Sequence, residues 1–269
     1  MNHSIIIPHY GRKDYLWRCI YSIVHSDFGW AVNSYEIVVV EYAPGPSRYK
    51  GTGRNSLTIW PAEKPFNKSR LLNYGIGKTD SELVTVLDCD MLVGPRWLRC
   101  SDLLFQDPAL TRVAYRVRHL TLHDRARVFE DGAAVGEMFA QYNAPGAFGP
   151  GGNEAGRFGL GWEAYGDPEI NTGLGGGAAL AQPWGNSQFT MRRRDIEGLS
   201  FDERQAGKGW EDVDFNRQVA AKFGDQFQGT IATEGSHGLL HMQHERPDDW
   251  DSGEIRERNL AKYRERWGK

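Results

Sequence analysis

Two carboxylates one residue apart, Asp88 and Asp90, follow an apolar run in the sequence LVTVLDCD. Carboxylates are poor strand residues, so this placement needs a chemical reason. Strand side chains alternate, so we expect both carboxylates on one face and Cys89 on the other. Like charges this close repel unless a cation lies near them. The pair is therefore a candidate cation site. The alternative is that one carboxylate caps the next helix, although Gly94 and Pro95 already mark a helix start.

Three histidines, His237, His241 and His244, occur near the C-terminus in the sequence HGLLHMQH. Histidine and carboxylate ligands together are typical of divalent-metal sites, and hard ions such as Mn²⁺ or Mg²⁺ prefer the oxygen-rich ones. His241 and His244 are three residues apart, so they reach one centre only in a helical or tight-turn conformation. The pair alone is weak evidence for a metal, because short motifs have a high rate of false matches.

The sequence GKGWEDVDF places Glu211, Asp212 and Asp214 at the predicted start of a helix. The helix dipole favours acidic residues there, so ordinary helix-start acids are one explanation. Trp210 beside these acids, after flexible glycines, is also typical of a sugar-binding edge with a catalytic carboxylate. A loop flanked by glycines can bring such a carboxylate to the hydroxyl whose proton it removes.

The sequence PFNKSRLLNYGI opens another predicted helix, with Asn67 as the capping residue. Phe66 precedes the cap, and the cations Lys68 and Arg70 follow it. Two cations at a helix start could hold a phosphate group, although both residue types are also common on solvated helix surfaces.

Strand and helix patterns alternate through the first hundred residues. Apolar strands are predicted at residues 4–9, 36–42, 57–60 and 83–88, with helical spacing at 14–26 and 67–78. This alternation indicates an α/β fold with a parallel sheet covered on both faces. Ligands gather at the carboxyl ends of the strands in such sheets. The candidate site residues at these ends are Pro8, Tyr10, Arg12, Glu41, Asp88 and Asp90.

A glycine-rich segment, residues 141–177, interrupts this pattern and shows no periodicity. One explanation is a solvated excursion of the chain. The other is a mobile lid whose aromatic rings meet a ligand. Those rings belong to Phe148, Phe158, Trp162 and Tyr165.

The bulk properties favour a globular protein with a real core, as one large domain or two intimate ones. The chain has 269 residues, 40% hydrophobic and 25% charged, with a net charge of −3. No overall basic excess points to nucleic acid, which stays open only as an acceptor. Three cysteines without metal-type spacing, no leader and no long apolar run predict a cytoplasmic protein without a membrane span.

Taken together, the motifs resemble the β-1,4-galactosyltransferase group and the related family-2 glycosyltransferases. SIIIPHYGRKDYLWRCI, FNKSRLLNYGI, LDCDM, GWEDVDFNRQ and HMQH occur in that order and at similar spacing. The resemblance implies a GT-A, Rossmann-like fold with a mixed, mostly parallel sheet flanked by helices. It further implies one compact domain, in which residues 1–110 bind the nucleotide sugar and residues 111–269 form the acceptor-binding and catalytic half.

The same resemblance implies roles for single residues. Asp90, His241 and His244 would bind Mn²⁺ or Mg²⁺, and Asp88 would contact the ribose or sugar of the donor. Asp212 would be the catalytic base, and Glu211 would hold the acceptor sugar beside Trp210. The uridine diphosphate contacts would be Arg12, Phe66 and Lys68.

The chain also departs from the group. Lys208 stands where the galactosyltransferases have a tryptophan, and the glycine-rich segment is longer, so the acceptor does not carry over. We expect a metal-dependent, inverting glycosyltransferase that uses a UDP-sugar and a carbohydrate or other hydroxyl-bearing acceptor. The alternatives are a nucleotidyltransferase that makes a nucleotide-sugar and a non-catalytic glycan-binding module.

Overall fold

A computed structural model provides the structure of the chain. The residues that it describes are 2–26, 34–42, 56–62, 66–115, 117–120, 122–132, 134–142, 188–205, 210–227, 229–232, 239–242, 244 and 253–268. Residues 143–177 of the predicted lid, with all four of its aromatic rings, lie outside the described residues, as do Lys208 and His237. Residues 141 and 142 end α5.

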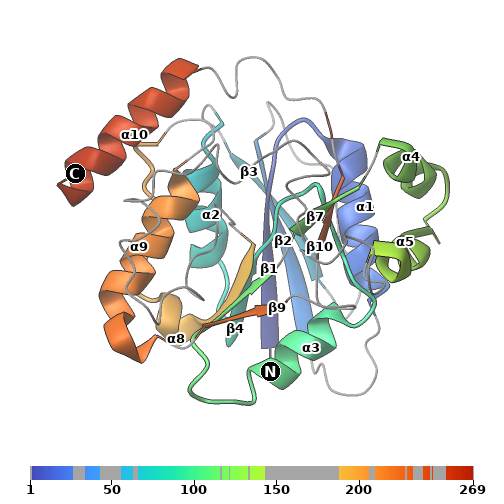
Figure 1. Cartoon of the computed structure of the whole chain (residues 1–269), viewed down its shortest axis with the longest axis horizontal. Helices are drawn as coiled ribbons and strands as arrows, with labels where there is room; N and C mark the ends of the chain where they lie inside the picture. Colours follow the sequence, from blue (N-terminus) through green and yellow to red (C-terminus); the bar gives the residue numbers. More distant parts are fainter. Residues whose placement is uncertain are drawn as a thin grey trace, which may run out of the picture.

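Strands and helices alternate in the first part of the chain, as the apolar pattern predicts (Figure 1). These elements are β1 (Asn2–His9), α1 (Lys13–Val24), β2 (Ser34–Tyr42), β3 (Ser56–Ala62), α2 (Lys68–Gly77) and β4 (Leu83–Val86).

The second part contains shorter elements and the long helices α9 and α10. They are β5 (Met91–Val93), α3 (Trp97–Leu104), β6 (Arg112–Tyr115), β7 (Val117–His119), α4 (Leu122–Glu130), α5 (Ala134–Tyr142), β8 (Phe189–Arg192), α8 (Arg193–Ile196), α9 (Glu211–Phe223), the 3₁₀ turn η3 (Gly224–Gln226), β9 (Gly229–Ala232), β10 (Leu239–His241) and α10 (Gly253–Trp267).

The main sheet has seven strands in the order β3-β2-β1-β4-β8-β6-β9. Only β8 runs antiparallel to its neighbours, β4 and β6, while the remaining pairs are parallel. The predicted α/β class with a mixed, mostly parallel sheet is therefore confirmed. Strands from both sides of residue 110 share this one sheet.

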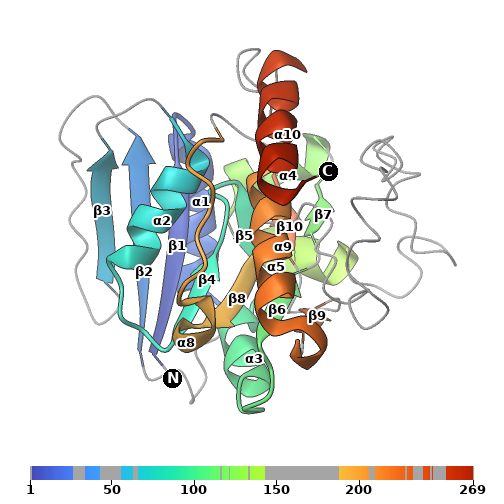
Figure 2. The same cartoon turned by 90° about the vertical axis from the view of Figure 1, so that its left-hand side faces the viewer.

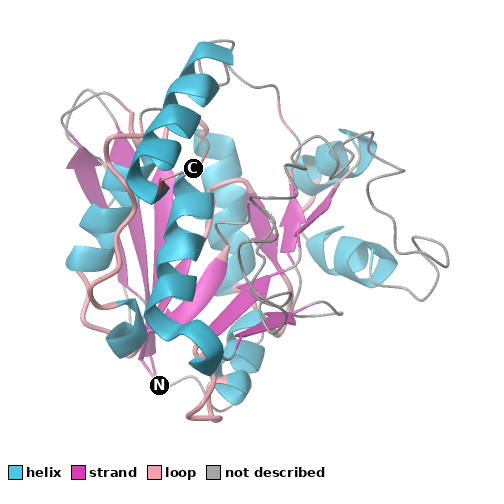
Figure 3. Ribbon diagram, turned by 60° about the vertical axis from the view of Figure 1, so that its left-hand side comes forward, coloured by secondary structure: helices cyan, strands magenta, loops and turns pink. Residues whose placement is uncertain are grey.

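Helices cover both faces of this sheet (Figures 2 and 3). Alternation along β1 decides which residue meets which layer. Ile5 and Ile7 pack with α1 and α3, whereas Ile6 packs with α2 and α9. All three side chains are fully buried, as expected for a strand covered on both faces.

Helix α2 lies unusually close to the sheet at Gly75. A Cβ atom at this position would lie 2.5 Å from Cγ2 of Ile6 and 3.0 Å from Cγ2 of Val40. A residue without a side chain is therefore required for α2 to sit at this depth, and the depth of α2 sets the position of Lys68 at its start.

A small second sheet positions the histidines. Its order is β5-β10-β7, with β10 antiparallel to β5 and parallel to β7. The backbone N–H of Met242 donates to the carbonyl of Asp90 at 2.9 Å. This bond fixes the end of β10 against the turn that carries Asp90.

Helix α10 packs against the first turns of α9 (Figure 2). The buried carboxylate of Asp214 accepts hydrogen bonds from Arg266 at 2.8 Å and from the indole of Trp267 at 2.7 Å. Arg217 donates to the hydroxyl of Tyr263 at 2.9 Å. Within the part of the chain that the structure describes, none of the helices has the length and apolar character needed to cross a bilayer.

Candidate active site

The two carboxylates of LDCD lie in a turn and not in a strand. Strand β4 ends at Val86, and the N–H of Met91 donates to the carbonyl of Asp88 at 3.2 Å. The expectation that Asp88 and Asp90 share a strand face is therefore wrong, because strand alternation does not hold in a turn. Their side chains meet different partners, Lys68 and Arg12 respectively.

Neither carboxylate caps the following helix. Helix α3 begins at Trp97, two residues beyond Pro95, and its N-cap residue Arg96 makes no side-chain capping hydrogen bond. Strand β5 lies between the carboxylates and this helix. The capping explanation for Asp88 and Asp90 is therefore excluded.

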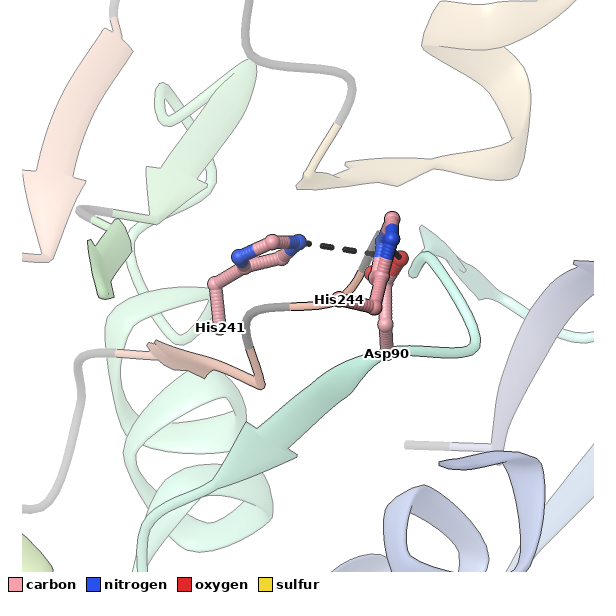
Figure 4. Close-up of side chains that lie close together, drawn as sticks. All are labelled: Asp90, His241 and His244. Atoms are coloured by element: carbon pink, nitrogen blue, oxygen red, sulfur yellow. Dashed lines mark hydrogen bonds and ion pairs between the residues drawn. The ribbon is translucent and has the colours of Figure 1, made fainter. Parts of the chain in front are cut away.

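Asp90, His241 and His244 converge on one point (Figure 4). Oδ2 of Asp90 lies 2.9 Å from Nε2 of His244 and 3.6 Å from Nε2 of His241. His241 is the last residue of β10, and His244 lies beyond the end of this strand. One carboxylate oxygen and two imidazole nitrogens, all within 4.8 Å of one another, form a donor set that suits Mn²⁺ or a similar divalent ion.

Arg12 lies against the same atoms. Its Nη1 is 3.0 Å from Oδ2 of Asp90 and 2.7 Å from Nε2 of His244. Arg12 is the N-cap residue of α1, just after β1, and 14% of its side chain is exposed. The guanidinium thus provides a positive charge beside Asp90.

Lys68 links Asp88 to the start of α9. Its Nζ lies 2.7 Å from Oδ1 of Asp88 and 3.6 Å from Oε1 of Glu211. Burial disfavours the charged ammonium, but the negative charges of Asp88 and Glu211 outweigh this effect and raise the pKa of Lys68 above its usual value. Lys68 is therefore charged at neutral pH, and it links Asp88 to Glu211 at the start of α9.

The predicted helix cap at Asn67 is confirmed, because its side chain accepts from the N–H of Arg70 at 2.9 Å. Lys68 and Arg70 do not form a joint cradle for phosphate. Arg70 pairs with Glu203 at 3.4 Å, and about half of each of these side chains is exposed. The two cations of the first turn of α2 thus have separate surroundings.

The acidic start of α9 contains three different environments. Glu211 is buried beside Lys68, Asp212 is partly exposed, and Asp214 is fully buried against α10. Trp210, the N-cap residue, has a left-handed backbone with φ 71° and ψ −14°, a conformation that favours glycine. Its ring lies 5.4 Å from that of Tyr263 in α10. Because this backbone conformation is strained for any residue other than glycine, the tryptophan side chain is a candidate for a functional role at this turn.

Aromatic rings line the ends of β1 and β2 at the predicted donor side. Tyr10 stacks on Phe66 with ring centroids 5.2 Å apart and lies at the same distance from Tyr42. Pro8 is paired with the backbone of Val40 in the sheet, one residue before Glu41. These residues meet at one edge because the carboxyl ends of parallel strands coincide.

Sequence reasoning missed His9 at the end of β1 and Arg112 at the start of β6. His9 is buried, and its Nδ1 lies 3.1 Å from Oε1 of Glu41; burial lowers the pKa of His9. Arg112 on β6 is buried, donates to the side chain of Asn216 and packs over the ring of Phe189. The position of His9 at the end of an apolar run is a sequence feature that could have identified it. Arg112 had no such feature, because no pattern predicts the four-residue strand β6.

Comparison with known families gives a match over the first part of the chain. Residues 4–100 match the family described as Glycosyl transferase family 2. No curated protein matches this chain. The matched range contains the turn with Asp88 and Asp90, and it ends before α9 and the histidines.

Several solved structures share the fold over most of this chain. TarS residues 1–349 from S. aureus, in complex with UDP-GlcNAc, is 12% identical, with a TM-score of 0.58, and the match covers 92% of this chain and 60% of that chain. For glucosyl-3-phosphoglycerate synthase from Mycobacterium tuberculosis, in complex with Mn²⁺, UDP-glucose and phosphoglyceric acid, the identity is 14%, the TM-score 0.54 and the coverage 99% and 80%. For the mannosyltransferase PcManGT from Pyrobaculum calidifontis, in complex with GDP-Man and Mn²⁺, the values are 14%, 0.53, 91% and 57%.

At these identities the likeness shows the fold alone, and it confirms the predicted GT-A fold. The chain spans about 60% of the length of the TarS chain that it matches. The narrower resemblance to the β-1,4-galactosyltransferases stays a prediction.

Proposed function

We propose that this protein is a metal-dependent, inverting glycosyltransferase that transfers a sugar from a UDP-sugar to an acceptor hydroxyl. One observation carries the proposal. The donor set of Asp90, His241 and His244 lies at the same edge as Lys68, which joins Asp88 to Glu211. The family-2 match and the UDP-sugars and Mn²⁺ in structures of the same fold support this assignment.

The donor is proposed to bind at the carboxyl ends of β1 and β2, in the half formed by residues 1–110. The rings of Tyr10 and Phe66 offer stacking surfaces for a base, and Glu41 offers hydrogen-bond acceptors. Asp88, held by Lys68, would accept from hydroxyl groups of the ribose or sugar. Pro8 and Arg12 border the same site.

Asp90, His241 and His244 would hold a divalent ion, for which they provide a fitting donor set. When bound, the ion would neutralise the charge that develops on the diphosphate leaving group. Arg12 adds a second positive charge beside Asp90. Together these groups would stabilise UDP as the bond between the sugar carbon and the phosphate oxygen breaks.

Asp212 is proposed as the base because it is the partly exposed carboxylate of this helix start. It would take the proton of the acceptor hydroxyl while that oxygen attacks the sugar carbon from the face opposite UDP. The bonding electrons leave with the diphosphate, and the configuration at the carbon inverts. Trp210 and Glu211 would hold the acceptor in the half formed by residues 111–269.

The proposed place of action is the cytoplasm. Cys19, Cys89 and Cys100 are buried thiols that form no disulfide bond, which is in keeping with a reducing compartment. The proposed acceptor is a carbohydrate or another hydroxyl-bearing molecule.

A screen of UDP-sugars with water as acceptor tests the function without knowledge of the acceptor. The protein is incubated with UDP-glucose, UDP-galactose or UDP-N-acetylglucosamine and Mn²⁺, and released UDP is measured. We expect release from at least one donor, with loss of release on chelation and in Asp90→Asn. Calorimetry should show UDP binding that requires the metal, since Asp88, Asp90 and the diphosphate otherwise repel one another.

Other outcomes point to the alternatives. Pyrophosphate release from UTP and a sugar phosphate would identify a nucleotidyltransferase. Binding of glycans that is indifferent to UDP, without any turnover, would identify a glycan-binding module. Neither result is compatible with the proposed transfer reaction.

A further inference from the structure

Three atoms at the candidate metal site form a closed triangle. Nη1 of Arg12 lies 3.0 Å from Oδ2 of Asp90 and 2.7 Å from Nε2 of His244, and the latter two atoms are 2.9 Å apart. All three distances are in the hydrogen-bonding range. The three groups therefore have to share the few protons and lone pairs that lie between them.

Counting these protons shows that the three contacts cannot all be hydrogen bonds. If Nε2 of His244 carries a proton, it donates to Asp90 but then faces the N–H of Arg12 donor to donor. If Nε2 carries no proton, it accepts from Arg12, and its lone pair faces the carboxylate of Asp90. In the second case, two lone pairs converge on one positively charged group, which is also the arrangement of two ligands around a metal ion.

We propose that the Arg12 guanidinium and a divalent metal ion compete for the same lone pairs of Asp90 and His244. The unprotonated Nε2 has a single lone pair, so it cannot accept from Arg12 and coordinate a metal at once. Metal binding must therefore move the guanidinium off His244.

The movement has a consequence that rests on the proposed function. Arg12 is the N-cap residue of α1, beside the carboxyl end of β1, where the diphosphate is proposed to bind. A guanidinium displaced from His244 can form charge-assisted hydrogen bonds with phosphate oxygens. Arg12 would thus be a positioning residue that couples metal entry to donor binding, and the coupling must be reciprocal.

Mn²⁺ titration of the full-length protein by electron paramagnetic resonance tests the competition without turnover. Arg12→Met keeps most of the aliphatic stem, and Arg12→Gln keeps a polar end group, so the result does not depend on how one variant folds. We expect both to bind Mn²⁺ about tenfold more tightly than the wild type without nucleotide. With saturating Mn²⁺, the same variants should bind UDP about tenfold more weakly.

Lys13→Met is the matched control, because it removes one positive charge from the adjacent, exposed position. Its Mn²⁺ affinity should stay near that of the wild type. If Lys13→Met tightens Mn²⁺ binding as much as Arg12→Met, the effect is general electrostatics, and the competition is refuted. Equal Mn²⁺ affinity in the wild type and both Arg12 variants, with binding lost in Asp90→Asn, refutes the competition but leaves the proposed metal site standing.

Failure of the metal site itself gives a different pattern. If none of these proteins binds Mn²⁺, while the wild type releases UDP from a UDP-sugar in the presence of chelator, Arg12 is itself the resident cation of the site. That result overturns both the competition and the metal dependence, and leaves glycosyl transfer in place.

Discussion

Asp212 and Asp214 lie two residues apart in the first turn of α9, yet their side chains have different surroundings. Asp214 accepts hydrogen bonds from Gln218, Arg266 and Trp267, and burial raises its pKa. Its oxygens are therefore committed to holding α10 in place. Asp212 is partly exposed, and the N–H of Val213 donates to its Oδ1 at 2.8 Å.

Two buried cations lie within electrostatic reach of Asp212. The charge of Asp212 helps to raise the pKa of Lys68 and opposes the lowering, by burial, of the pKa of Arg112 to about 9. Both cations attract the carboxylate of Asp212, and a carboxylate is the group that a base needs. The environment therefore favours Asp212 over Asp214 as the residue that takes the acceptor proton.

Asp212→Asn keeps the shape of the side chain but removes the basic carboxylate. We expect turnover of the active UDP-sugar to fall by about 10²-fold or more. Mn²⁺ and UDP affinity, measured by calorimetry, should stay near those of the wild type. Asp90→Asn should instead lose metal and donor binding together. Wild-type turnover in Asp212→Asn would show that the base is elsewhere.

Asp214→Asn is the control for damage to α9. It should lower the midpoint of thermal unfolding, because it removes the charge that pairs with Arg266 in a buried position. Turnover per folded molecule should change much less than in Asp212→Asn. Equal losses of turnover in the two variants would mean that both act through the structure of α9.

The residue types of the site could be predicted from the sequence, but several of their contacts could not. LDCD and HMQH supply candidate ligands by residue type and spacing, and the family resemblance selects Asp90, His241 and His244 among them. The structure brings these three together. The separation of Asp88 from Asp90 depends on where β4 ends, which an apolar run fixes only to within a few residues. The contact of Lys68 with Glu211 joins positions far apart in the chain, so no local pattern reveals it.

At the level of elements, length decided what could be predicted. The strands β1 and β2 have eight and nine residues, and α1 has twelve, so their periodicity is clear. The strands β5, β7 and β10 have three residues each, too few for any period to show. This small sheet places His241 beside Asp90, so the missed strands are those that assemble the candidate metal site.

Gly75 and Gly77 of α2 offer a matched test of the packing that positions Lys68. In Gly75→Ala the new Cβ would lie 2.5 Å from Ile6, so α2 must move away from the sheet. We expect a loss of about 1–3 kcal/mol in the free energy of unfolding, as is typical of overpacked cores. In Gly77→Ala the new Cβ meets no atom within 4 Å, and alanine favours the helix, so stability should stay equal or rise by up to about 1 kcal/mol.

Chemical unfolding in urea measures both substitutions. If Gly75→Ala is as stable as Gly77→Ala, the close approach of α2 to β1 is not rigid, and the depth of α2 does not hold Lys68. Calorimetry with UDP adds a second measure, because movement of α2 should weaken donor binding in Gly75→Ala only.

At the scale of the whole molecule, a buried chain of polar side chains crosses the main sheet. His3 contacts Thr85 at 2.5 Å, Thr85 contacts Thr190 at 2.5 Å, and Thr190 contacts the hydroxyl of Tyr115 at 2.6 Å. The Tyr115 hydroxyl lies 2.7 Å from that of Ser101 in α3. These contacts join β1, β4, β8 and β6, so they connect strands from both sides of residue 110 within the main sheet.

Because His3 is buried among these polar side chains, it makes the stability of the fold sensitive to acid. Burial lowers the pKa of His3 from 6.5 to about 3, because the charged imidazolium would lose its hydration in the core. Below pH 6.5, His3 is therefore protonated in the unfolded chain but stays neutral in the folded protein. Its effect on the free energy of unfolding is absent above pH 6.5, and stability is lost as the pH falls from about 6.5 towards 3.

His3→Gln removes this titration while an amide can still reach Thr85. Between pH 7 and pH 5, protonation of His3 in the unfolded chain should lower the free energy of unfolding of the wild type by about 2 kcal/mol. This decrease should be absent in the variant. The variant will be less stable than the wild type at pH 7 if glutamine packs less well, so the informative quantity is the change with pH. Urea unfolding followed by circular dichroism at both pH values measures this change.

His123→Gln is the matched control, because the side chain of His123 is 81% exposed. Its free energy of unfolding should depend on pH as that of the wild type does. Parallel pH profiles for the wild type and His3→Gln would place the acid sensitivity elsewhere, with the buried His9 at the donor edge as the next group to test.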